Sequence, residues 1–183
     1  MRNGGSVIDK NIMLTGFMGS GKSTVGRLLA DRLERPFLDA DQEIERLHGM
    51  PVTDIFRSMG ETKFRQMERE YMLGLCHGER QAVVSLGGGA FMQDEIRDAC
   101  LSTSFVVFLD IGWDAWHARH HLLKETRPLL QSKSMEEIRD LFETRRNVYK
   151  LSHFTVPTDG LAPEEVTERI EQAIGRVESK EPG

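Results

Sequence analysis

The sequence predicts an α/β fold built around a mostly parallel sheet. Short apolar runs alternate along the chain with longer segments of helical periodicity, which is the order of elements in an α/β protein. Several of the short runs are apolar on both faces, as in Ala82-Val83-Val84-Ser85-Leu86, and strands buried between two layers of helices have that composition. The 183 residues suffice for one such domain with its own core.

Each expected strand is followed by a helical pattern. The first helix carries Val25, Leu28 and Leu29 on one face, and the last begins with Pro163 and acidic residues in its first turn. We expect strands at residues 11–16, 36–39, 82–86, 104–109 and 153–156. We expect helices near residues 22–34, 60–77, 92–99, 113–123, 135–150 and 162–177.

The chain is expected to form a single domain over residues 11–177, with flexible tails at 1–10 and 178–183. Two segments interrupt the alternation of strands and helices, at 40–60 and 120–134. Insertions of this kind over an α/β sheet often cover a ligand.

The composition limits the classes of function. A net charge of −5 gives no support to a nucleic-acid-binding surface, which would be basic. Cys76 and Cys100 have no metal-binding spacing and are expected to be buried thiols in a reducing compartment. No apolar run reaches the roughly 18 residues of a membrane span. We therefore expect a soluble cytoplasmic protein that binds neither nucleic acid nor membrane, and a monomer, because no long heptad pattern is present.

A glycine-rich loop follows the first expected strand. Residues 16–23 fit the pattern G-x-x-x-x-G-K-[ST] and lie between an apolar segment and a helical pattern. Glycines let the backbone approach an anion closely, and the positive end of the helix adds to the attraction. Lys22 can reach the β- and γ-phosphates of a nucleotide, and the Ser23 hydroxyl can bind Mg²⁺. The alternative is a glycine-rich turn that merely begins a helix, and the strand and helix in register argue against it.

Two carboxylates follow the second expected strand. Asp39 and Asp41 are two residues apart, so in an extended strand both would point the same way at the carboxyl end of the sheet. One could hold the metal through water and the other could accept a hydroxyl proton. The alternative for Asp41 is a helix cap.

Further candidates lie at a second glycine run and at several arginines. Residues 87–89 are three glycines at a strand end, where they permit close approach to a ligand. Arg65 either offers a planar fork to a carboxylate or forms a surface pair with Glu68, three residues on. An arginine on a mobile segment, such as Arg127, can close over a transferring phosphoryl group. The histidines near residues 117–121 include a pair four residues apart but no third ligand, so we interpret them as a solvated helix face.

Together these motifs resemble the shikimate kinase family, which is similar to the nucleoside monophosphate kinases. The resemblance implies a three-layer α/β/α fold with a five-stranded parallel sheet of order 2-3-1-4-5, a substrate-binding segment near 40–70 and a lid near 120–134. It also implies transfer of the ATP γ-phosphoryl to the 3-hydroxyl of shikimate, in the route to chorismate and the aromatic amino acids, with Mg²⁺ as cofactor. The matching pieces are residues 16–24, Asp39-x-Asp41, Ile55-Phe56, Gly60-Glu61, Phe64-Arg65, 87–89 and Arg127-Pro128-Leu129-Leu130.

On the nucleotide side, the resemblance implies that Lys22 holds the phosphates, that Ser23 binds Mg²⁺ and that Asp39 reaches the metal through water. Arg127 would face both substrates from the lid, and Arg119 would lie beside the adenine. The expected ATP-binding residues are Gly19, Ser20, Gly21, Lys22, Ser23, Thr24, Arg119 and Arg127. The expected catalytic residues are Lys22, Asp41 and Arg127.

On the acceptor side, the resemblance implies that Asp41 binds the shikimate hydroxyls and acts as the base or orienting group. A second carboxylate-binding arginine should stand four residues before a tyrosine, which selects Arg145 over Arg146. The sequence departs from the family pattern here, because Asn147 replaces the usual proline before Tyr149. The expected shikimate-binding residues are Asp41, Arg65, Gly87, Gly88, Gly89 and Arg145.

Three alternative functions agree less well with these motifs. A gluconate kinase of the same fold would also accept an anionic polyol, but residues 87–89 and 127–130 favour shikimate. A GTPase or regulatory nucleotide-binding module would need an Asn-Lys-x-Asp guanine reader, which is lacking. A homologue that binds ATP without catalysis is disfavoured, because the polar groups expected in the pocket are all present.

Overall fold

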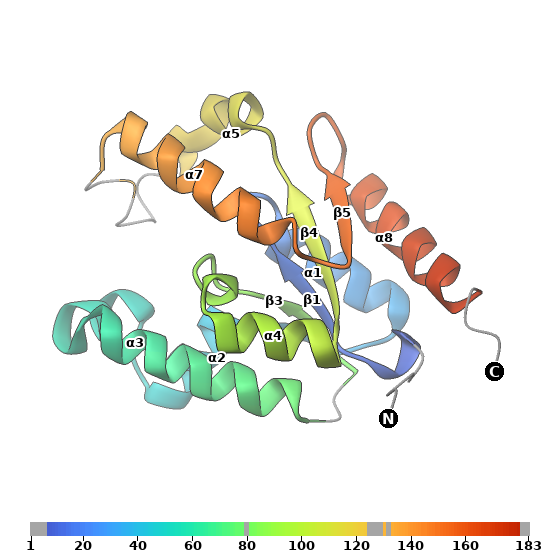
Figure 1. Ribbon diagram of the computed structural model, residues 1–183, viewed down its shortest axis with the longest axis horizontal. Helices are drawn as coiled ribbons and strands as arrows, with labels where there is room; N and C mark the ends of the chain where they lie inside the picture. Colours follow the sequence, from blue (N-terminus) through green and yellow to red (C-terminus); the bar gives the residue numbers. More distant parts are fainter. Residues whose placement is uncertain (1–6, 79–80, 124–129, 131–132, 180–183) are drawn as a thin grey trace.

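Five short strands form one parallel sheet. They run over Ile12–Thr15 (β1), Phe37–Asp39 (β2), Val83–Ser85 (β3), Phe105–Asp110 (β4) and Phe154–Pro157 (β5). Their order is β2-β3-β1-β4-β5 and every pairing is parallel, which confirms the predicted topology (Figure 1). The computed structural model describes residues 7–78, 81–123, 130 and 133–179.

Helices connect the strands and cover both faces of the sheet. The α-helices run over Lys22–Leu33 (α1), Ala40–His48 (α2), Val52–Cys76 (α3), Asp94–Thr103 (α4), Trp113–Arg119 (α5), Met135–Tyr149 (α7) and Pro163–Glu178 (α8). Short 3₁₀ helices lie at Val7–Asp9 (η1), Ala90–Met92 (η2) and His120–Leu122 (η3). In the part of the chain that the structure describes, no helix is long and apolar enough to cross a membrane.

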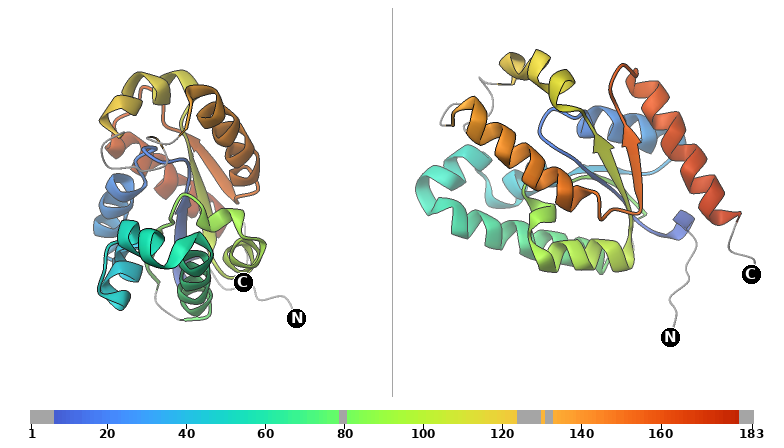
Figure 2. Two further views of the ribbon diagram at one scale, coloured as in Figure 1. Left: turned by 90° about the vertical axis from the view of Figure 1, so that its left-hand side faces the viewer. Right: turned by 45° about the horizontal axis from the view of Figure 1, so that its top comes forward.

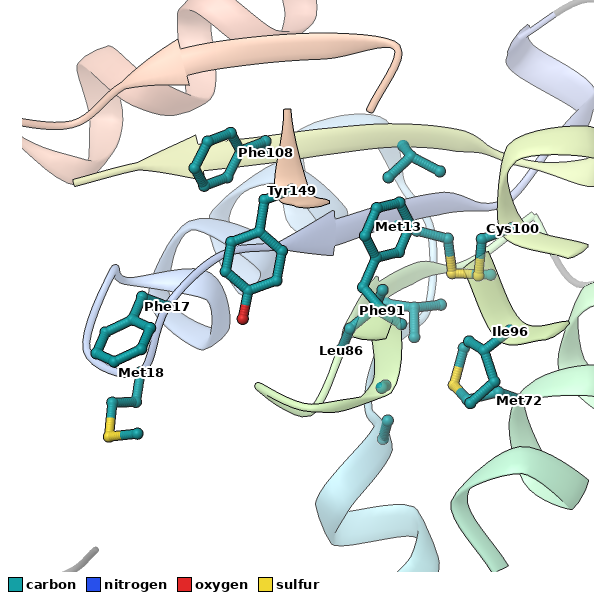
Figure 3. Close-up of a cluster of buried hydrophobic side chains, with 14 of the residues drawn as sticks. Met13, Phe17, Met18, Met72, Leu86, Phe91, Ile96, Cys100, Phe108 and Tyr149 are labelled. Carbon is teal, nitrogen blue, oxygen red and sulfur yellow. The ribbon is translucent and has the colours of Figure 1, made fainter. Parts of the chain in front are cut away.

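Alternate residues of β1 serve two separate cores. Ile12 and Leu14 pack with buried side chains of α1 and α8, whereas Met13 packs with side chains of α3, α4, α5 and α7. Neighbouring side chains of a strand point to opposite faces, so each layer of helices has its own apolar cluster. Figure 2 shows the sheet between these layers, and Figure 3 shows part of the larger cluster around Met13, Phe91 and Tyr149.

The strand register brings three connections together at one edge of the sheet. Ser85 lies opposite Leu14 on one side and Asp39 on the other, so β1, β2 and β3 end side by side. The glycine-rich loop leaves β1, helix α2 leaves β2 and residues 87–89 leave β3 at this edge. Parallel α/β sheets bind ligands at the carboxyl ends of their strands.

The segment expected to be irregular at 40–60 is largely helical, which corrects the sequence prediction. It forms α2 and the first two turns of α3, and Ile44 of α2 packs with Ile55 and Phe64 of α3 in a small third core. Gly60 interrupts α3 with φ 81° and ψ 167°, a conformation suited to glycine, so the helix expected from residue 60 does begin anew there. The expected helix at 113–123 ends as an α-helix at Arg119 and continues as a 3₁₀ turn.

Candidate active site

The phosphate-binding loop joins β1 to the first turn of α1. Gly19 and Gly21 have φ of 77° and 95°, where a side chain would be strained, so the loop depends on glycine at both positions. The Lys22 ammonium donates hydrogen bonds of 2.9 Å to the Gly16 carbonyl and 3.2 Å to the Phe17 carbonyl. The positive end of α1 and a lysine therefore face the same open space, as an anion site requires.

An open pocket of about 440 Å³ lies beside this loop. It is lined on one side by the loop and the start of α1, and on the other by α2 and the end of β3. Ser20 belongs to the loop but does not line the pocket, because its side chain is buried and only 3% exposed. The lining includes Gly19, Gly21, Lys22, Ser23, Thr24, Asp39, Asp41 and Gly88.

Ser23 and Asp39 line the pocket side by side and are hydrogen-bonded to each other. The Ser23 hydroxyl donates a 2.8 Å hydrogen bond to Oδ2 of Asp39, while Oδ1 of Asp39 accepts one from the backbone N–H of Gln42. A hydroxyl and one carboxylate fit Mg²⁺, which is usually held by one or two protein oxygens together with water and phosphate oxygens.

The two aspartates reach the pocket from different elements. Asp39 ends β2 and caps α2, whereas Asp41 lies in the first turn of that helix. The expectation that both project from one extended strand is therefore wrong, and so is the alternative that Asp41 is the cap. A helix that starts immediately after the strand still turns both carboxylates into the same pocket.

The first two glycines after β3 make room for charged side chains. A methyl group on Gly87 would lie 2.6 Å from Oδ1 of Asp41 and 2.8 Å from Oε1 of Glu68. A methyl group on Gly88 would lie 3.3 Å from Nη1 of Arg145. The run thus brings together carboxylates and a guanidinium that are far apart in the sequence.

The third glycine, Gly89, accommodates Arg65. A methyl group there would lie 2.6 Å from both terminal nitrogens of the guanidinium. Arg65 also forms a 2.6 Å ion pair with Glu68, whose Oε2 accepts a 2.9 Å hydrogen bond from Gln93 as well. Because Glu68 is 1% exposed, this is a buried contact and not a surface pair. Burial raises the pKa of Glu68, and the Arg65 cation opposes that rise.

The neighbouring arginines of α7 have different environments. Arg145 is 9% exposed, its guanidinium lies 5.9 Å from the Phe17 ring, and no acidic side chain in the described ranges forms an ion pair with it. Arg146 forms two hydrogen bonds with the Asp110 carboxylate, at 2.8 and 2.9 Å, and these bonds raise its pKa. Arg145 is therefore available to an anion at the glycine run, whereas Arg146 stabilises the end of β4.

The two remaining predicted arginines are not brought to the pocket in the described part of the chain. Arg119 is exposed at the end of α5 and does not line the pocket. Arg127 lies outside the described residues, as do Pro128 and Leu129, while Leu130 is buried against the larger core. The histidines lie along an exposed face, where the rings of His117 and His120 stack 4.9 Å apart.

Sequence reasoning overlooked Gln93 and gave Glu68 only the role of an ion-pair partner. A signal for Glu68 was present, because it lies four residues after Phe64 and four before Met72 on the buried face of α3. A carboxylate on such a face requires a partner, which Arg65 supplies. Gln93 follows the 3₁₀ helix η2 and carries no comparable signal in the sequence.

Comparison with known proteins agrees with this geometry. A sequence model described as shikimate kinase matches residues 18–175. A shikimate kinase of Bacillus subtilis (strain 168) is 46% identical over 168 residues, covering 92% of this chain and 90% of that protein. A solved structure of shikimate kinase from Acinetobacter baumannii in complex with shikimate is 36% identical, with a TM-score of 0.85 over 93% of this chain and 96% of that chain. For the shikimate kinase of Aquifex aeolicus, the identity is 33% and the TM-score 0.81, over 93% of this chain and 99% of that chain. The chain belongs to the shikimate kinase family.

Proposed function

We propose that this protein transfers the γ-phosphoryl group of ATP to the 3-hydroxyl of shikimate, giving shikimate 3-phosphate and ADP. The observation that carries the proposal is the convergence of Arg65, Arg145 and Asp41 on the glycine run, because Asp41 and Gly88 also line the pocket beside the phosphate loop. Shikimate is a small polyol with one carboxylate. Two guanidinium groups suit the carboxylate, and Asp41 suits the hydroxyls.

In this proposal the phosphate loop, Ser23 and Asp39 bind Mg·ATP. We assign the β- and γ-phosphates to the loop amides and Lys22, and Mg²⁺ to Ser23, with Asp39 acting through water. Bound Mg²⁺ would neutralise charge on the phosphates. Arg127 retains its predicted role over the transferring group on the basis of the sequence alone.

Side chains of helices α2, α3 and α7 bind the acceptor, shikimate. Arg65 and Arg145 would hold the carboxylate and so orient the ring, while Asp41 accepts the hydroxyl proton as the oxygen attacks phosphorus. The P–O bond to ADP breaks as the new one forms, so no covalent enzyme intermediate is required. Phosphoryl transfer depends mainly on positioning and charge neutralisation, which this arrangement supplies.

The test is ADP release from Mg·ATP in a coupled assay, with shikimate, gluconate and AMP offered separately. Turnover that depends on shikimate alone supports the proposal. Turnover with gluconate or AMP alone would keep the phosphate site but contradict the assignment of the acceptor pocket. ATP binding without any turnover would favour a regulatory or inactive relative. The monomeric state and the cytoplasmic location stay predictions, and sedimentation velocity would test the first.

A further inference from the structure

Tyr149 links helix α7 to the glycine run. It is the last residue of α7 and is 1% exposed, and its hydroxyl donates a 2.6 Å hydrogen bond to the carbonyl oxygen of Gly88. The bond joins residues 61 positions apart in the sequence. A buried hydroxyl needs a partner, and the carbonyl of the half-buried Gly88 supplies it.

The sheet holds the phenol ring in place. The Tyr149 ring packs against Phe108 of β4, with ring centroids 5.3 Å apart, and Figure 3 shows the hydroxyl pointing away from Phe108. A ring supported by a central strand has little freedom to follow a shifting loop. The well-packed ring therefore holds the hydroxyl in place, and the hydroxyl holds the Gly88 carbonyl through the hydrogen bond.

The same helix presents Arg145 to the same glycine. Arg145 is one turn before Tyr149, and residues four apart lie on one face of a helix. Its Nη1 is the atom that a methyl group on Gly88 would meet at 3.3 Å. Burial raises the pKa of Tyr149 to about 12, with the Arg145 cation opposing, so the phenol keeps its proton and stays a donor at neutral pH.

Holding the carbonyl of a peptide also restrains the N–H of the same peptide unit. The group that joins Gly88 to Gly89 is planar and trans, so its N–H points opposite to the carbonyl that Tyr149 holds. The hydrogen bond thus restrains the direction of the Gly89 N–H and keeps the Gly88 peptide beside the helix that carries Arg145. Gly89 in turn adjoins the Arg65 guanidinium.

We infer that Tyr149 is a positioning residue that holds the Gly88 peptide in register with Arg145 and thereby shapes the site for the acceptor carboxylate. The inference rests on the proposed function, because it takes the glycine run and the two arginines to be the shikimate site. The hydroxyl of Tyr149 is hydrogen-bonded to Gly88 and to Arg145, and no described hydrogen bond joins it to the phosphate loop, Ser23 or Asp39, so we expect its effect on acceptor binding.

The test is Tyr149→Phe, which removes one oxygen and keeps the ring. We expect the KM for shikimate to rise about tenfold, the fold-change that corresponds to one hydrogen bond, with the KM for ATP and kcat little changed. Hydrogen exchange at the amides of residues 87–90 should become faster in the variant. Shikimate-dependent turnover of the wild type is measured first, so that a failure of the proposed function is recognised separately.

The matched control is Ile138→Val, which removes one buried methyl group from the same helix, about three turns before Tyr149. It should lower the melting temperature without changing either KM. The inference is overturned if Tyr149→Phe leaves the KM for shikimate unchanged or raises the KM for ATP equally. It is also overturned if Ile138→Val raises the KM for shikimate as much as Tyr149→Phe does. If Tyr149→Phe does not fold, Phe108→Leu serves as the second variant, because it loosens the packing of the Tyr149 ring. We expect it to raise the KM for shikimate and not the KM for ATP. An unchanged KM for shikimate, or an equal rise in both KM values, would overturn the inference.

Discussion

The Ser23 hydroxyl lies 2.8 Å from Oδ2 of Asp39, so a side chain of the phosphate loop is hydrogen-bonded to the carboxylate that ends β2. The other oxygen of that carboxylate accepts a 3.4 Å hydrogen bond from the first turn of α2. Asp39 therefore has two separable tasks, one at the proposed metal site and one as a helix cap.

Two substitutions separate the tasks of Asp39. Asn caps helices as well as Asp does, so Asp39→Asn should keep the stability while raising the Mg²⁺ concentration for half-maximal activity about tenfold or more. Asp39→Ala should lose the cap as well, at about 1 kcal/mol, which lowers Tm by about 2–4 °C in a protein of this size. The measurements are Mg²⁺ titrations of activity and thermal unfolding. An unchanged Mg²⁺ requirement in Asp39→Asn would remove Asp39 from the metal site.

Asp41→Asn tests the proposed base. Loss of general base catalysis costs about 10²–10⁴-fold, so kcat should fall within that range. ATP binding should persist, because the phosphate loop is untouched. Steady-state kinetics and ATP titration measure the two effects. The control is Glu43→Gln on the same helix, whose carboxylate pairs with Arg46 at the surface, and it should leave kcat unchanged. Retained turnover in Asp41→Asn would show that Asp41 is not essential.

Gly89→Ala tests whether the glycine run exists to admit arginine side chains. The added methyl group would meet the flexible tip of Arg65, so Arg65 must move while the core stays in place. We expect a higher KM for shikimate, a nearly unchanged KM for ATP and a small change in Tm. Gly74→Ala is the control on the helix that carries Arg65. A methyl group at Gly74 meets open space, and the substitution should stabilise the helix by about 0.5–1 kcal/mol without a kinetic effect.

Features encoded by neighbouring residues were predictable from the sequence. The phosphate loop is a local pattern, and its strand, turn and helix appear where the motif requires them. Helix α2 entered the sequence prediction only through the alternative that Asp41 caps a helix, because just Ala40 and Ile44 of its nine residues are buried. Its stability comes from packing on α3, which a local pattern does not reveal.

The convergence on the glycine run could not be worked out from spacing alone. Arg65, Gly89 and Arg145 belong to separate elements, and only the sheet order places those elements together. The resemblance to a family selected Arg145 over Arg146. The structure supplies a physical distinction, because Asp110 already neutralises Arg146 whereas Arg145 has no acidic partner among the described residues.

Arg145→Ala should therefore affect shikimate binding, whereas Arg146→Ala should affect only stability. Removing Arg145 takes a buried cation from the proposed carboxylate site, so the KM for shikimate should rise far more than the KM for ATP. Removing Arg146 breaks a partly exposed ion pair, which should cost about 1 kcal/mol of stability at most and leave the shikimate KM unchanged. Kinetics and thermal unfolding of both variants decide the matter. Equal effects of the two substitutions on shikimate binding would contradict the assignment of Arg145.

Glu68 should make the stability of the protein depend on pH in a defined direction. Burial raises its pKa in the folded state, so the folded protein holds this proton more tightly than the unfolded chain does. Relative to Glu68→Gln, which cannot ionise, the wild type should be most stable below the ordinary carboxyl pKa of about 4.3 and should lose that advantage as pH rises through the raised pKa. Unfolding of both proteins at acidic and neutral pH measures the difference. Glu61→Gln is the control, since the carboxylate of Glu61 also pairs with Arg65 but is 69% exposed. A difference between wild type and Glu68→Gln that stays constant with pH, or that grows in favour of the wild type as pH rises, would contradict a raised pKa at this buried carboxyl.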